Sequence, residues 1–114
     1  MPDIYHIVKR SDWDAAVTAG VYAPGSLDHE GFIHCSKQWQ VLDVANSQYQ
    51  GQKGLVLLRI DTKNVTPEIR NEDCYDIGQS FPHVYGPLNI EAVKDVYDLK
   101  TDDDGAFSLP SELS

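Results

Sequence analysis

Apolar residues along the chain follow two spacings, one typical of strands and the other typical of helices. Short runs rich in β-branched and aromatic residues predict strands. The predicted strands cover residues 3–8, 32–35, 54–61 and 92–99. The run "GLVLLRID" at 54–61 is almost continuously apolar, which is typical of a central strand buried on both faces. A further short strand is predicted near Ile69, and an extended piece at 81–88.

Two segments in the first half of the chain have helical spacing. Residues 11–20 predict a helix that Ser11 caps and Gly20 ends, with an apolar face of Trp13, Ala16 and Val17. Residues 36–51 predict a second helix, with Ser36 as its cap and Gly51 as its stop. Its apolar face is expected to contain Trp39, Leu42, Ala45 and Tyr49.

The segments between these elements read as loops. Residues 21–31 contain Pro24, Gly25 and Gly31 and predict a loop, and "TDDDG" predicts a turn. The tail from 106 to 114 either docks through Phe107 and Leu109 or frays. The pattern therefore predicts one α+β domain over residues 1–114, with two early helices followed mostly by strands.

Composition narrows the class of protein. The net charge of −9 disfavours binding to nucleic acid, because affinity for phosphate backbones comes largely from Lys and Arg. No apolar run approaches the roughly 20 residues that a membrane span needs, and the N-terminus lacks a secretory signal. We therefore expect a cytoplasmic protein with no membrane partner, whose cysteines, Cys35 and Cys74, are reduced thiols.

Three of the four histidines lie inside apolar runs. His34 ends the strand at 32–35 and lies just before Ser36, where backbone N–H groups at a helix start attract anions such as phosphate. His6 lies within the first strand, and a buried histidine needs partners for both ring nitrogens. We expect His6 and His34 to share a pocket, with Tyr22 adding an aromatic face. The alternative is that these histidines are core residues bonded to backbone carbonyls.

The segment "FPHVYGPL" is expected to form another wall of the same cleft. His83 and Tyr85 point to one face if the segment is extended, and Pro82 and Pro87 stiffen it. The alternative is a rigid structural turn with aromatic packing. Glu72, in "NEDCYD", is a candidate carboxylate.

Common catalytic and metal-binding motifs are missing from the sequence. It contains no GxGxxG, GxxxxGK[ST], HExxH or GxSxG, and the spacing of His29, His34 and Cys35 does not suit a zinc knuckle. No metal site is therefore predicted. Cys35 beside His34 could act as a nucleophile, or it could be a small buried apolar residue.

The segments "IYHI", "AGVY", "SLDHEGFIHCS", "LVLLRID" and "FPHVYGPLN" together resemble the bacterial family called Domain of Unknown Function 952, from Ile4 to about Pro110. That family more distantly resembles the ADP-ribosyltransferase fold, a small split β-sheet, mixed or antiparallel, that holds NAD in a cleft. "YHI" before a helix and "GVY" is similar to the opening of DNA ADP-ribosylating toxins. "FIHCS" is similar to the V-H-L-S segment of RNA 2′-phosphotransferases.

The resemblance implies positions for the site residues. His6 would lie at the NAD ribose, and His34 and Ser36 beside the nicotinamide or the phosphates. The sequence departs from those transferases in two ways: no arginine adjoins His6 or His34, and no Q/E-x-E motif occurs late in the chain. Glu72 and Glu91 are the possible substitutes for the missing glutamate.

Three functions are compatible with this sequence. The first is NAD-dependent ADP-ribosyl transfer or NAD hydrolysis, with His34 and Glu72 as catalytic residues. NAD would then be held by His6, Tyr22, His34, Ser36, His83 and Tyr85. The second is a module that binds a small-molecule nucleotide or metabolite without turnover. The third is a structural domain whose histidines belong to the core.

Overall fold

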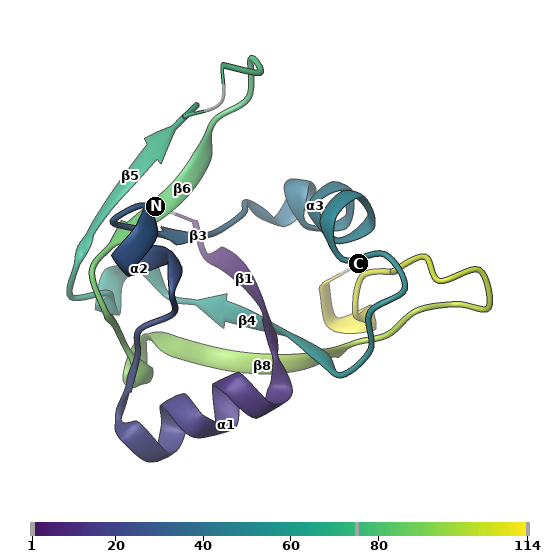
Figure 1. The fold of residues 1–114 in the computed structure, drawn as a ribbon, viewed down its shortest axis with the longest axis horizontal. Coiled ribbons are helices and arrows are strands. Elements are labelled where there is room, and N and C mark those ends of the chain that lie inside the picture. The colour runs from purple at the N-terminus through teal and green to yellow at the C-terminus, as the bar shows by residue number, and fades with distance from the viewer. Residues whose placement is uncertain (1, 75, 114) are drawn as a thin grey trace.

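The computed structural model describes residues 2–74 and 76–113. Its helices are short: α1 (Arg10–Ala19), α2 (Ser26–His29) and α3 (Val41–Gln48), with 3-10 turns η1 (Gln38–Gln40), η2 (Thr62–Asn64), η3 (Ile90–Ala92) and η4 (Ser111–Leu113). The strands are β1 (Ile4–Lys9), β2 (Val21–Tyr22), β3 (Ile33–His34), β4 (Leu55–Ile60), β5 (Glu68–Glu72), β6 (Phe81–Tyr85), β7 (Leu88–Asn89) and β8 (Val93–Leu99). The fold is α+β, as the sequence predicts (Figure 1).

The strands form separate antiparallel sheets. The first has the order β1-β4-β8, the second β3-β6-β5, and β2 pairs with β7. The first two sheets meet at one isolated bridge, where Tyr5 and Ser36 exchange backbone hydrogen bonds of 2.8 and 2.7 Å. This bridge brings the end of β3 next to the outer edge of β1, so the strands that carry His6 and His34 are neighbours.

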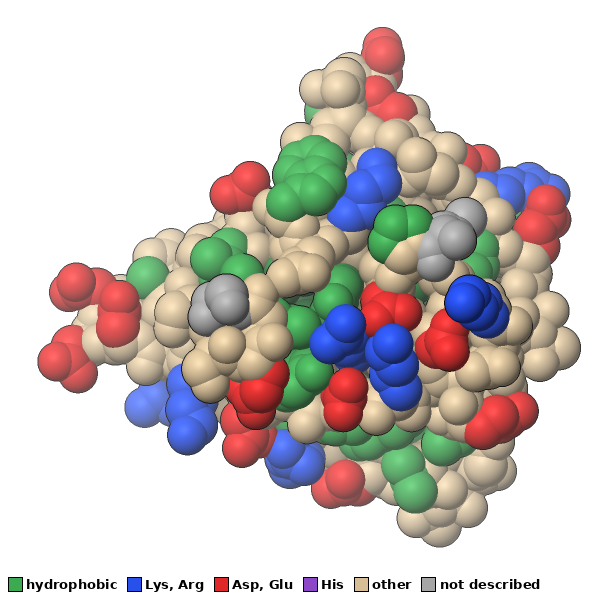
Figure 2. All heavy atoms as spheres, turned by 180° about the vertical axis from the view of Figure 1, so that it is seen from behind, with side chains coloured by type: hydrophobic (Ala, Val, Ile, Leu, Met, Phe, Trp, Pro, Cys, Tyr) green, Lys and Arg blue, Asp and Glu red, His purple; other side chains and the backbone are tan. Residues whose placement is uncertain are grey.

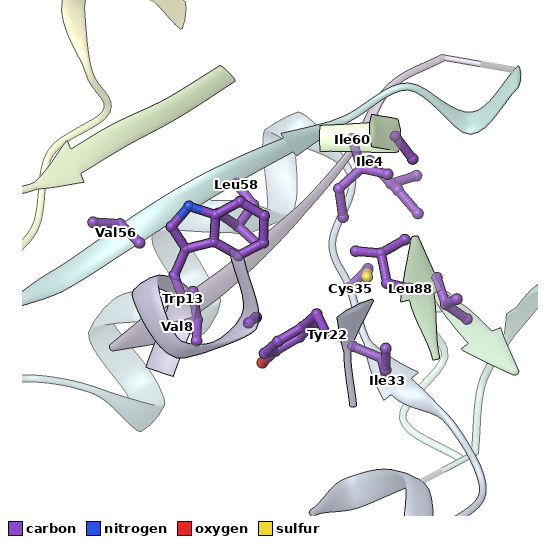
Figure 3. Close-up of a cluster of buried hydrophobic side chains, with 13 residues drawn as sticks. Ile4, Val8, Trp13, Tyr22, Ile33, Cys35, Val56, Leu58, Ile60 and Leu88 are labelled. Atoms are coloured by element: carbon purple, nitrogen blue, oxygen red, sulfur yellow. The ribbon is translucent and has the colours of Figure 1, made fainter. Parts of the chain in front are cut away.

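Strand β4 is central in the first sheet, which explains its nearly continuous apolar sequence. Val56, Leu58 and Ile60 contribute to a cluster that also contains Trp13 of α1. Figure 3 shows these side chains together with Tyr22, Ile33 and Leu88. The alternate residues of β4 belong to a second cluster on the other face of the strand, with members from α3 and the C-terminal segment. Members of this second cluster include Leu55, Leu57, Val41, Ala45 and Phe107.

The first helix begins earlier than the sequence predicts. It starts at Arg10, directly after β1, and Lys9 precedes it with no side-chain cap, so the assignment of Ser11 as the cap is wrong. Gly20 ends it as predicted, with φ at +86° and its N–H bonded to the carbonyl of Ala16. Val17 is 50% exposed, so the buried face of the helix is narrower than expected.

The second predicted helix is shorter than expected and begins differently. Ser36 does not cap it, because the bridge to Tyr5 holds Ser36 in an extended pairing. The chain instead enters through η1, where the side chain of Gln40 accepts a hydrogen bond from the backbone N–H of Lys37, and α3 starts at Val41. Trp39 is 63% exposed and lies outside the apolar face to which its spacing assigned it.

Other segments agree more closely with the sequence. The strand expected near Ile69 is β5, which pairs with β6. Phe107 is buried and Leu109 packs on the second cluster, so the tail docks. The predicted loop at 21–31 contains β2 and the short helix α2. Within the described part of the chain, no helix is both long and apolar enough to cross a membrane.

Charged side chains of both signs are mixed on the surface. Figure 2 shows a face on which Lys and Arg lie among Asp and Glu. One such group joins Asp3 to Arg59 and to Lys94, each at 2.8 Å. Pairing of this kind leaves the basic groups near carboxylates rather than gathered into a surface of one sign.

Candidate functional site

A cavity of about 760 Å³ opens along the outer edge of β1. This volume lies within the range of roughly 300–1,000 Å³ that is usual for small-molecule sites. Its wall includes residues from β1, from the segment between β2 and η1, from α3 and from the segment that leads into β6. Of the residues that the sequence analysis singled out, it contains His6, Tyr22, His34, Cys35, Ser36 and His83.

His6 is held by hydrogen bonds at both ring nitrogens. Nδ1 lies 2.5 Å from the backbone oxygen of His34, and Nε2 lies 2.7 Å from the hydroxyl of Tyr22. A carbonyl oxygen only accepts, so Nδ1 carries the proton and Nε2 accepts from the Tyr22 O–H. Burial lowers the pKa of His6 from 6.5 to about 4, so the ring is neutral near pH 7.

His34 faces a carboxylate. Its Nε2 lies 2.8 Å from Oε1 of Glu30, and both side chains are about 40% exposed, at 39% and 41%. Helix α2 ends just before Glu30, and Gly31, with φ at +86°, then turns the chain into β3. The carboxylate and the imidazole therefore meet across a tight turn, and both belong to the cavity wall.

His83 lies deeper, beneath an aromatic ring. It is 1% exposed and stacks on Phe32, with ring centroids 4.0 Å apart and an angle of 15° between the planes. Phe32 also contacts the rings of His34 and Tyr85, at centroid distances of 4.9 and 5.3 Å. Phe32 thus fixes the relative positions of three candidate site residues. Phe32 is not among the site residues predicted from the sequence, although it directly precedes Ile33 and His34.

Glu72 binds His83 and Tyr85. Its Oε1 lies 3.1 Å from Nδ1 of His83 and accepts a short hydrogen bond from the Tyr85 hydroxyl. The Tyr85 hydrogen bond, followed by that from His83, lowers the pKa of the Glu72 carboxyl. The guanidinium of Arg70 lies 4.5 Å from the centroid of the Tyr85 ring. His83 and Tyr85 therefore point to one face, as an extended segment requires.

The two cysteines are free thiols, as predicted, and they lie in different environments. Cys35 is buried in the first core cluster, and burial raises its pKa to about 12. A thiol with such a pKa is a poor nucleophile near neutral pH, so the structure favours the other interpretation of Cys35, a small buried apolar residue. Cys74 is exposed, and its Sγ lies 3.7 Å from Nδ1 of His83.

The structure brings some of the candidate residues together and separates others. His6, Tyr22, His34, Ser36 and His83 share the cavity wall. Glu72 and Tyr85 are not among the described residues of that wall; Glu72 is bonded to His83, and Tyr85 is bonded to Glu72. Glu91, the other possible substitute for a late glutamate, is also absent from the wall as described and accepts a hydrogen bond from Asn89.

The carboxylate that does adjoin His34 is Glu30, which the sequence analysis did not select. The signal was the spacing Glu-x-x-x-His in "EGFIH", but a spacing of four usually suggests a helix face, and this segment contains a glycine turn and a strand. Only the turn at Gly31 brings the two side chains together.

The outer edge of β1 also faces the cavity with backbone groups. In an antiparallel ladder, alternate residues direct their N–H and C=O to opposite sides of the strand. Tyr5 directs both groups away from β4, to Ser36. Ile7, two residues further along the strand and also in the cavity wall, directs its N–H and C=O the same way.

The chain belongs to the family described as "Protein of unknown function (DUF952)", which matches residues 7–96. The crystal structure of protein CC0527 from Caulobacter crescentus is similar to it over 97% of each chain, with 34% sequence identity and a TM-score of 0.86. The solution NMR structure of CC0527 covers 93% of this chain and 91% of that one, with 33% identity and a TM-score of 0.72. No curated protein matches the sequence.

Proposed function

We propose that the cavity binds a nucleotide of the NAD type and that the protein cleaves the bond between nicotinamide and ribose. The observation that carries this proposal is one cavity of nucleotide size whose wall combines His6, His34 and the carboxylate of Glu30. The resemblance of "YHI" and "FIHCS" to segments of ADP-ribosyltransferases supports the choice of ligand, and a split sheet with the cavity between its halves is compatible with that fold.

The charge of the cavity wall suits this chemistry. Asp12, Glu30 and Asp43 contribute carboxylates, and Lys9 contributes an amine. In the reaction, the C–N bond breaks and nicotinamide leaves with the bonding electron pair, so the positive charge of its ring passes to the ribose as an oxocarbenium-like state. A carboxylate next to the ribose stabilises that developing charge. Water or another acceptor then adds to the ribose and releases a proton.

The chain's own groups can orient the ligand before the bond breaks. The N–H and C=O of Ile7 face the cavity as an adjacent donor and acceptor, which matches the acceptor and donor of a carboxamide. The bonds of His6 to the His34 carbonyl and to the Tyr22 hydroxyl hold this part of the wall in one arrangement. Such preorganisation lowers the entropy lost on binding.

Binding without turnover is the second candidate function. It is favoured by the position of Glu72, the carboxylate first assigned to catalysis, which is bonded to His83 and Tyr85 and lies outside the described cavity wall. Catalysis in this cavity would then depend on a carboxylate of the wall itself, with Glu30, which is bonded to His34, as the candidate.

A ligand panel separates these functions. We would measure the thermal unfolding of the protein with NAD⁺, NADH, ADP-ribose and nicotinamide. NAD⁺ should stabilise it, by about 2.7 kcal/mol at 100 times Kd. NADH should stabilise it less, because it has the same diphosphate but an uncharged ring. Glu30→Gln should abolish the difference between NAD⁺ and NADH, whereas the control Glu91→Gln, outside the described cavity wall, should preserve it.

Chromatographic assay for released nicotinamide then decides between cleavage and binding. Release that is lost in His34→Ala and Glu30→Gln supports the enzyme. A stabilising effect of NAD⁺ without release supports the binding module. If neither NAD⁺ nor ADP-ribose at millimolar concentration stabilises the protein, cleavage of NAD and binding of an NAD-type nucleotide are both refuted.

A further inference from the structure

Three side chains with different metal-binding groups lie close together: Glu72, Cys74 and His83. Their ligand atoms all lie within 4.8 Å of one another. Glu72 ends β5, Cys74 follows two residues later, and His83 lies in the middle of β6. The pairing of β5 with β6 thus joins residues that are nine to eleven positions apart in the sequence. We propose that these three side chains form a binding site for a divalent transition metal, with Zn²⁺ as the preferred ion.

Two of the three distances between the ligand atoms are close to those of tetrahedral zinc, and the third, from the Cys74 sulfur to the Glu72 carboxylate, is at most 4.8 Å. Bonds of about 2.3 Å to sulfur and about 2.0–2.1 Å to nitrogen or oxygen place sulfur and nitrogen about 3.6 Å apart, and nitrogen and oxygen about 3.3 Å apart. The corresponding distances are 3.7 Å from Cys74 Sγ to His83 Nδ1 and 3.1 Å from His83 Nδ1 to Glu72 Oε1. An ion would therefore require only small side-chain movements.

The local field favours a cation. The carboxylates of Glu72, Asp73 and Glu30 all act electrostatically on the Cys74 side chain. These negative charges disfavour a lone thiolate but attract a divalent ion, which in turn displaces the thiol proton to solvent. The set of thiolate, imidazole and carboxylate ligands suits Zn²⁺ better than Mg²⁺ or Ca²⁺, which prefer oxygen ligands alone.

The supporting contacts are those that a metal site needs. Stacking on Phe32 orients the His83 ring, and the Tyr85 hydroxyl donates to Glu72. Outer contacts of this kind fix ligand geometry and tune affinity. With metal bound, His83 would coordinate through Nδ1 and carry its proton on Nε2. Three protein ligands leave a fourth tetrahedral position for water or another ligand, and exposed Cys74 leaves the site accessible.

This site is independent of the proposed nucleotide function, although His83 also lies in the cavity wall. The test uses the whole protein, stripped with a chelator and then titrated with Zn²⁺ in competition with a chromophoric chelator. Substitution with Co²⁺ gives a second readout, since a thiolate ligand produces a charge-transfer band and tetrahedral coordination produces intense d–d bands. We expect one Zn²⁺ per chain and both Co²⁺ signatures.

The variants assign the ligands. Cys74→Ser should remove the charge-transfer band and weaken Zn²⁺ binding at least about 100-fold, the upper range of the loss that follows removal of an outer-shell partner. Loss of the band in Cys74→Ser assigns it to Cys74, because Cys35 is present in both the wild type and the variant. Glu72→Gln should also weaken binding, whereas Glu68→Gln, exposed on the same strand and paired with Arg70, should not.

The inference would be overturned if the wild type bound no Zn²⁺, or if Cys74→Ser bound Zn²⁺ as tightly as the wild type. It would also be overturned by a Co²⁺ complex without a thiolate band. None of these results would affect the thermal-shift test with NAD⁺, so the two proposals fail separately.

Discussion

The stability of the folded protein should depend on pH through His6. The pKa of this residue falls from 6.5 to about 4 because burial disfavours the charged ring. Protonation would also convert Nε2 from acceptor to donor and force the Tyr22 hydroxyl to reverse its role. Between these two values the unfolded chain binds more protons than the folded protein does, so the free energy of unfolding rises with pH. This contribution is complete above pH 6.5 and is lost as the pH falls toward 4.

The size of the effect follows from the same values. The fall in the pKa of His6 from 6.5 to about 4 corresponds to a loss of about 3 kcal/mol in the free energy of unfolding over the whole pH range. About 2 kcal/mol of this is lost between pH 7 and pH 5. The ring keeps some exposure to the cavity, so this figure is an upper bound. The hydrogen bonds from Tyr85 and His83 lower the pKa of the Glu72 carboxyl, so this group titrates at a lower pH than an ordinary glutamate.

Urea unfolding at pH 7 and pH 5 measures the difference directly. The wild type should lose up to about 2 kcal/mol, and His6→Gln should remove most of this dependence by eliminating the titrating group. His29→Gln, which removes a solvent-exposed histidine, serves as the control and should behave like the wild type. Equal stability of the wild type at both pH values, or an undiminished dependence in His6→Gln, would refute the reasoning.

Two further predictions concern the aromatic groups around the site. Tyr22→Phe leaves Nε2 of His6 without its donor and should lower the free energy of unfolding, measured in urea, by about 1–3 kcal/mol. The control Tyr49→Phe, which removes another partly buried hydroxyl, should lower it by less than about 0.5 kcal/mol. Equal losses in the two variants would contradict the importance of the hydrogen bond. His83→Ala should cost about 3 kcal/mol, because the ring is 1% exposed, whereas Trp39→Ala, at 63% exposed, should stay within about 0.5 kcal/mol in the same experiment. A larger loss from Trp39→Ala than from His83→Ala would show that the burial of these rings is misassigned.

The local pattern of the sequence determined the main elements of the fold. The apolar run at Leu55–Ile60 requires burial on both faces, which only a central strand provides, and β4 is central. Gly20 ends α1 because glycine adopts the left-handed conformation there at little cost. The α+β class and the extended form of "FPHVYGPL" follow from the same short-range information.

Tertiary pairing decided the features that the sequence misassigned. Ser36 has the residue type of a cap, but two backbone hydrogen bonds to Tyr5, 31 positions earlier in the chain, hold it in an extended bridge. Trp39 has the spacing of a core residue, but the chain enters α3 through a 3-10 turn, which changes the direction of its side chain. Neither effect can be predicted from the residues of one segment alone.

The same distinction between local sequence and tertiary structure applies to the candidate site residues. The sequence by itself identified His6, His34 and His83, because a histidine within an apolar run must find hydrogen-bond partners when it is buried. The partners themselves come from distant segments: Tyr22 for His6, and Glu72 for His83. Glu30 lies near His34 in the sequence, yet only the turn at Gly31 directs its carboxylate to the ring. Chain topology determines which side chains form these hydrogen bonds. A hydrogen bond depends on the relative position of two side chains, and residue type and spacing alone do not determine that position.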